Sequence, residues 1–145
     1  MLNLTIVCGQ HIAKPEGSKS VIDEAYVDIR LRGHPDDDGE EKTQATTKRV
    51  KNNGFNPVWN EAFNFDIKVP QLAFLELKIK EHTGKARSIM DLTKMSMKSK
   101  DKDLGIFCSP LQLIQEGYRR VPLKNKSGKD LAPATLLIHI AINKS

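Results

Sequence analysis

The stretch that decides the fold lies near the middle of the chain and reads Asn52-Asn53-Gly54-Phe55-Asn56-Pro57-Val58-Trp59-Asn60-Glu61-Ala62-Phe63-Asn64-Phe65. The Asn53-Gly54 pair favours a tight turn, because both residues tolerate a left-handed backbone conformation. After the turn, Trp59, Phe63 and Phe65 are spaced by even numbers of residues, which places them on one face of a strand. We therefore expect a turn followed by a strand whose aromatic side chains are at least partly buried.

Alternating or short apolar runs recur along the chain and predict eight strands. They fall at residues 2–8, 25–31, 44–51, 59–67, 74–79, 104–110, 118–123 and 134–142. Turn signals such as Ser127-Gly128 separate most of them. Between two of the strands, Leu111 to Gly117 has the apolar spacing of a short helical turn that ends at a glycine. The pattern predicts an all-β, antiparallel sandwich or barrel.

Length and composition are those of one globular domain over residues 1–145, with 39% hydrophobic residues. No apolar run approaches the roughly 20 residues that span a bilayer. The first residues also lack the basic and apolar segments of a signal peptide. Both cysteines, Cys8 and Cys108, lie in apolar runs. We expect them to be reduced core residues of a cytoplasmic protein.

Charge is unevenly distributed along the chain. Residues 1–72 carry 9 Lys and Arg against 11 Asp and Glu, whereas residues 73–145 carry 14 against 7. Much of this surplus lies in a long insert between two expected strands, from His82 to Lys102. Loops of this length are usually functional or disordered. The insert is expected either to bind anionic surfaces or to be a solvated loop, and its basic residues are Lys85, Arg87, Lys94, Lys98, Lys100 and Lys102.

Three stretches together resemble the C2 domain of phosphoinositide-specific phospholipase C. The first is the Asn-Pro-x-Trp-Asn-Glu-x-Phe-x-Phe motif of residues 56–65, which marks C2 domains in general. The others are Val69 to Leu75 and the segment from Gln115 to Leu123, which is followed by Pro133-Ala134-Thr135-Leu136. The resemblance covers most of the chain except the insert. It implies an eight-stranded C2-type β-sandwich with the phospholipase C topology.

The resemblance also implies where calcium would bind. Many C2 domains hold Ca²⁺ between loops at one end, and this ion takes about six to eight oxygen ligands. The family pattern falls here on Asp23, Asn53 (or its neighbour Asn52), Glu81 and Asp103. The match is degenerate, because Thr83 replaces an expected aspartate and the nearby lysines repel a divalent cation. We expect weak or absent Ca²⁺ binding. The alternative is that these carboxylates are solvated and pair with lysines.

A second basic cluster consists of Lys42, Lys48, Arg49 and Lys51. In some C2 domains the corresponding surface binds phosphoinositide headgroups, and the alternative is an ordinary exposed strand. No catalytic constellation is present in the sequence, and the phospholipase reaction of the resembled family belongs to a separate barrel domain that 145 residues cannot hold. The chain is therefore expected to be a non-catalytic module of a larger enzyme or a free-standing relative.

Two functions are expected from the resemblance and the charge. The first is a module that binds anionic phospholipid at the periphery of the membrane, with no cofactor and with weak or absent dependence on Ca²⁺. The second is an intramolecular scaffold whose partner is the catalytic domain of the parent enzyme. Nucleic-acid binding is not expected, because only 6% of residues are aromatic and most of these are assigned to the core.

Overall fold

The computed structural model describes residues 1–12, 22, 24–33, 43–51, 56–82 and 101–142. These residues form nine strands and two short 3₁₀ helices. The strands are β1 (Leu2–Gln10), β2 (Glu24–Arg32), β3 (Gln44–Thr46), β4 (Val50–Lys51), β5 (Val58–Phe65), β6 (Phe74–Glu81), β7 (Lys102–Pro110), β8 (Gly117–Lys124) and β9 (Asp130–Ile142). The helices are η2 (Pro70–Leu72) and η3 (Leu111–Leu113).

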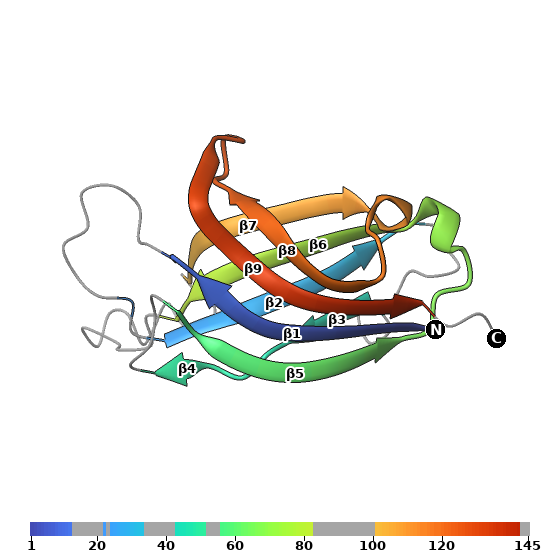
Figure 1. The fold of residues 1–145 in the computed structure, drawn as a ribbon, viewed down its shortest axis with the longest axis horizontal. Helices are drawn as coiled ribbons and strands as arrows, with labels where there is room; N and C mark the ends of the chain where they lie inside the picture. Colours follow the sequence, from blue (N-terminus) through green and yellow to red (C-terminus); the bar gives the residue numbers. More distant parts are fainter. Residues whose placement is uncertain (13–21, 23, 34–42, 52–55, 83–100, 143–145) are drawn as a thin grey trace, which may run out of the picture.

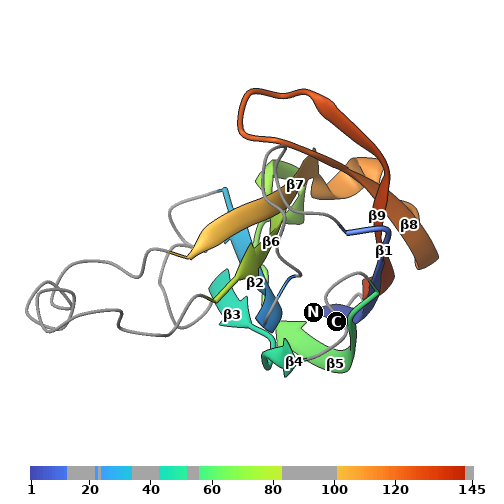
Figure 2. The same ribbon diagram turned by 90° about the vertical axis from the view of Figure 1, so that its left-hand side faces the viewer.

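The strands are arranged in two layers, as expected for a sandwich (Figure 1). The strand order is β3-β2-β6-β7-β8-β9-β1-β5, all pairs are antiparallel, and β4 also pairs with β2. The pairing of β7 with β8 consists of Ile106 opposite Lys124. At this narrow junction the layer of β2, β6 and β7 meets the layer of β8, β9, β1 and β5 (Figure 2).

The core lies between the layers and is built mainly from alternate residues of the strands. Inward-facing side chains of both layers are fully buried, among them Leu4, Ile6, Ile29, Leu77, Ile79, Leu123, Leu136 and Ile138. Trp59 is 8% exposed and donates its indole N–H to the carbonyl oxygen of Ala25, 3.2 Å away. This bond links β5 of one layer to β2 of the other. The predicted burial of Trp59, Phe63 and Phe65 is confirmed.

The prediction of a single strand at residues 44–51 was wrong, because the structure has two short strands there, β3 and β4. Thr47 lies between them, and its hydroxyl oxygen accepts the backbone N–H of Val27 at 2.8 Å. The backbone N–H of Lys48 turns away and donates to the carboxylate of Glu61 at 2.7 Å. A threonine side chain thus replaces one ladder bond of β2, and the chain bends toward β5.

Two further expectations need correction. Neither cysteine is in the core: Cys8 is only partly buried and Cys108 is exposed, and both are free. Cys108 is opposite Glu76 on the outer face of its sheet, and a register shift between Ile6 and Cys8 turns Cys8 outward. The helical turn is also shorter than expected, since only η3 is helical and Gly117 already begins β8.

Candidate functional site

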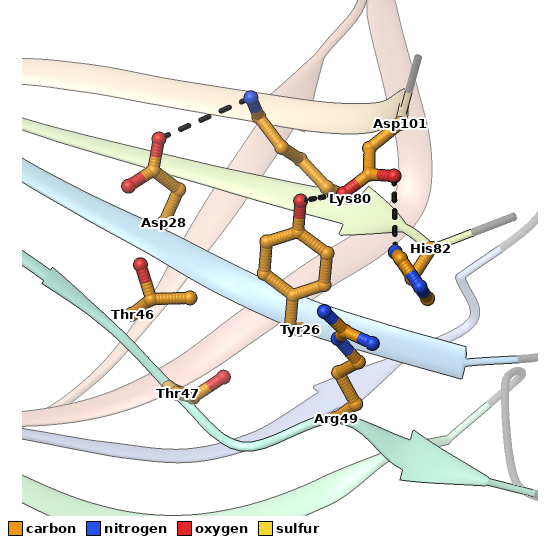
Figure 3. Close-up of a pocket in the computed structure, with 8 residues that line it drawn as sticks. All are labelled: Tyr26, Asp28, Thr46, Thr47, Arg49, Lys80, His82 and Asp101. Atoms are coloured by element: carbon orange, nitrogen blue, oxygen red, sulfur yellow. Dashed lines mark hydrogen bonds and ion pairs between the residues drawn. The ribbon is translucent and has the colours of Figure 1, made fainter. Parts of the chain in front are cut away.

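A pocket of about 340 Å³ opens on the outer face of the β3-β2-β6 sheet. We call it the β2–β6 pocket (Figure 3). Successive side chains of a strand point to opposite faces of the sheet. Ala25 and Val27 of β2 and Ile79 of β6 face the core, so their neighbours in each strand face outward, on the side of the pocket. The lining residues are Tyr26, Asp28, Thr46, Thr47, Arg49, Lys80, His82 and Asp101.

Asp101 organises one side of the pocket. One of its carboxylate oxygens accepts a hydrogen bond from the Tyr26 hydroxyl, and the other lies 3.2 Å from Nδ1 of His82. Burial, followed by this hydrogen bond, raises the pKa of Tyr26 well above its usual range. Tyr26 therefore stays protonated and donates to Asp101. His82 and Asp101 flank residues 83–100, so their contact joins the two ends of that segment.

Most of the formal charges in the pocket are paired within the described residues. Nζ of Lys80 lies 4.0 Å from a carboxylate oxygen of Asp28. Arg49 and Lys51 both reach the carboxylate of Glu24, at 3.8 Å and 3.3 Å. The pocket thus has cationic and hydroxyl donors for an anionic group, but two carboxylates share the space. An anion bound there would have to compete with Asp28 for Lys80.

The candidate headgroup residues are only partly brought together. Arg49 lines the pocket, and Lys51 lies next to it through their shared partner Glu24. The side chain of Lys48 is exposed, and this residue does not line the pocket. Lys42 lies outside the described residues.

Two of the four candidate calcium residues can be placed. Glu81 is the last residue of β6 and is 1% exposed, on the core side of the sheet. Asp103 pairs with Lys80 in the ladder, on the outer side, and lies 3.9 Å from Nζ of Lys80 and 3.4 Å from Nζ of Lys126. The two carboxylates therefore face opposite sides of the β6–β7 pair. Asp23 and Asn53 lie outside the described residues.

The C2 domain pattern matches residues 1–116. This chain belongs to the C2 domain family. It is 32% identical to mouse (Mus musculus) inactive phospholipase C-like protein 2, over 98% of this chain and 11% of that protein. It is 34% identical to mouse 1-phosphatidylinositol 4,5-bisphosphate phosphodiesterase zeta-1, over 96% of this chain and 19% of that protein. The C2 domain thus spans a small part of the relatives it matches.

Solved structures agree with this assignment. The crystal structure of L. pealei PLC21 superposes with a TM-score of 0.71 at 29% identity, over 97% of this C2 domain and 15% of that chain. A single domain of plant extended synaptotagmin 1 superposes with a TM-score of 0.65 at 16% identity, over 96% of this C2 domain and 90% of that chain. The second likeness concerns the fold alone. The C2 domain resembles those of phospholipase C proteins, some of which are named as inactive and others as phosphodiesterases.

Of the six expected membrane-binding residues, the structure describes Lys102 alone, at the end of the C2 domain where β6 stops and β7 begins. Lys102, the first residue of β7, is exposed. Lys85, Arg87, Lys94, Lys98 and Lys100 lie outside the described residues. Among the residues that are described, no helix has the length and apolar character needed to cross a membrane.

Of the eight residues that line the β2–β6 pocket, the sequence pointed to Arg49 alone. The seven that were not predicted are Tyr26, Asp28, Thr46, Thr47, Lys80, His82 and Asp101. One signal was available for Tyr26 and Asp28, because they share the polar face of a strand whose other face is apolar. Lys80 and Asp101 come from distant segments that meet only through strand pairing. Their convergence depends on the β2–β6 and β6–β7 registers.

Proposed function

We propose that this C2 domain binds anionic phospholipid membranes with the end that carries Lys102, and that it needs little or no Ca²⁺. The observation that carries the proposal is the environment of Asp103. Two lysine ammonium groups already lie within 4 Å of this candidate calcium ligand, and Glu81 faces the other side of the sheet. Such an end attracts anionic lipid more readily than a divalent cation.

The names of the relatives indicate the kind of protein in which this C2 domain would act. We infer that the C2 domain belongs to a phosphoinositide phospholipase C-type protein and acts at the cytoplasmic face of a membrane. Catalysis would then reside outside this chain, which contributes attachment to the lipid surface. The β2–β6 pocket supports headgroup binding as a subsidiary role, because a volume of about 340 Å³ falls in the range of small-molecule sites.

Vesicle sedimentation tests the proposal directly. The chain should bind vesicles of phosphatidylcholine containing about a third phosphatidylserine and should not bind phosphatidylcholine alone, because the attraction is electrostatic. Binding in chelator should be nearly as strong as binding in Ca²⁺. Equal sedimentation with both vesicle types would contradict the preference for anionic lipid, and a strict need for micromolar Ca²⁺ would contradict a calcium-independent site with Asp103 as a lysine partner.

Replacing Asp103 by asparagine separates the two roles of this carboxylate. We expect Asp103→Asn to strengthen binding to anionic vesicles in chelator by about five-fold, because it removes one negative charge and releases Lys126. If Asp103 were a calcium ligand, the same substitution would instead reduce Ca²⁺-dependent binding. The control is Asp66→Asn, which removes an exposed carboxylate just after β5 and leaves the environments of Asp103 and Lys126 unchanged.

A second function, docking against the catalytic domain of a parent enzyme, is favoured by the outer face of the other sheet. Ladder partners Tyr118, His139, Thr5 and Ala62 form one outward row, and Ala141, Asn3 and Asn64 form the next. Neither row contains Lys, Arg, Asp or Glu, whereas β2 and β6 present a dense set of charges on their outer face. Depletion of charge is typical of the centre of a protein interface.

A further inference from the structure

The turn between β8 and β9 is the uppermost part of the chain in Figure 1 and is unusually basic. It reads Lys124-Asn125-Lys126-Ser127-Gly128-Lys129, with three lysines and no acidic residue. All three lysines are exposed, and the side chain of Lys126 is 77% exposed. In the sequence, these lysines lie outside both the insert at 82–102 and the cluster of Lys42, Lys48, Arg49 and Lys51.

The turn is held in one conformation by Asn125. The Oδ1 atom of this residue accepts hydrogen bonds from Ser127 N at 3.0 Å, Ser127 Oγ at 2.8 Å and Lys129 N at 2.9 Å. Backbone bonds from Asn125 N to Lys129 O and from Gly128 N to Asn125 O close the loop. Gly128 has a φ of 85°, which suits glycine. The backbone is therefore preorganised, and only lysine side chains would lose freedom on binding.

The turn lies at the same end of the molecule as the start of β7. Nζ of Lys126 is 3.4 Å from a carboxylate oxygen of Asp103, the neighbour of Lys102. Lys124 is also the residue that pairs with Ile106 where the two layers join. Lys124, Lys126 and Lys129 thus form a basic cluster beside Asp103, within the part of the chain that the structure describes.

We propose that the β8–β9 turn is a preorganised contact for the headgroups of anionic phospholipids. The inference rests on the proposed membrane function, and it names residues 124–129 as a site of lipid contact. Anionic lipid is the ligand that charge complementarity favours, because the turn has three exposed lysines and the ion pair recorded for them among the described residues is that of Lys126 with Asp103. The turn carries no aromatic or large apolar side chain, so its contact is electrostatic and weakens as salt concentration rises.

The test is a charge-matched pair of double variants in the intact chain. Lys126→Gln with Lys129→Gln removes two charges from the turn, and Arg32→Gln with Lys68→Gln removes two charges from the opposite end. Arg32 ends β2 and Lys68 follows β5, and both are exposed. With vesicles of phosphatidylcholine and phosphatidylserine at low salt, we expect the turn variant to bind about 25-fold more weakly and the control to stay within about two-fold of the parent.

The outcomes distinguish this inference from the proposed function. If the parent binds anionic vesicles and the turn variant binds equally well, the turn is not a contact, although membrane binding stands. If both variants bind anionic vesicles equally weakly, binding depends on net charge alone and the assignment to the turn is overturned. If the parent does not prefer anionic vesicles, both proposals fail. Thermal melting should give the same midpoint for the turn variant and the parent, since the substituted side chains are exposed.

Discussion

Replacing Trp59 by alanine should lower the free energy of unfolding by about 3–5 kcal/mol, the cost of emptying a large buried aromatic site. The indole ring is almost completely buried, and its N–H is bonded to Ala25 of the other layer. The substitution would therefore remove both apolar packing and a hydrogen bond that holds the edge of β5 against β2. Urea denaturation followed by circular dichroism measures the change.

Two variants control for this prediction. Trp59→Phe keeps most of the ring and should cost clearly less than Trp59→Ala. Tyr118→Ala removes an aromatic side chain that is 69% exposed and should change stability by less than about 1 kcal/mol. A Trp59→Ala protein as stable as the Tyr118→Ala protein would show that the indole does not pack between the layers.

Residues with a strong two-residue period could be predicted well from the sequence. In β2 the buried residues Ala25, Val27 and Ile29 alternate with outward residues, and register with β6 follows because a shift of one residue would expose all of them. The motif around Trp59 located β5 for the same reason. Expected strand ends differed from the observed ones by a few residues, as in β7 and β9.

The division of the expected strand at residues 44–51 could not be predicted. Threonine is a good strand former, and nothing local indicates that the Thr47 hydroxyl will accept the N–H of Val27, which lies 20 residues earlier. The outward orientation of Cys8 could not be predicted either, because it results from a bulge in β1 that nothing in the local sequence indicates.

The candidate site was less predictable than the fold, because its residues meet through strand pairing. Tyr26, His82 and Asp101 come from β2, the end of β6 and the residue before β7, and only the registers of these strands bring them into contact. The family pattern did locate Asp103. It could not indicate that Lys80 and Lys126 would surround this carboxylate, since they lie 23 residues before and after it in the sequence.

Reversing three charges in the basic insert should produce the largest change in membrane binding. Lys94, Lys98 and Lys100 lie outside the described residues, so the expectation rests on charge alone. Each lysine near an anionic leaflet contributes on the order of 1 kcal/mol, so replacing all three with glutamate should weaken binding by about 100-fold or more at low salt. The difference should shrink as added salt shortens the Debye length from about 10 Å at 0.1 M. Vesicle sedimentation at several salt concentrations measures both effects.

The matched control replaces the same three lysines with arginine, which keeps the charge and should preserve binding. A glutamate variant that binds anionic vesicles as well as the parent at low salt would remove the insert from the proposed surface. The basic turn at residues 124–129 would then be the main contact at this end. A glutamate variant that melts at a markedly lower temperature than the arginine variant would instead show that the insert contributes to the folded core, and its loss of binding would reflect unfolding rather than lost attraction to lipid.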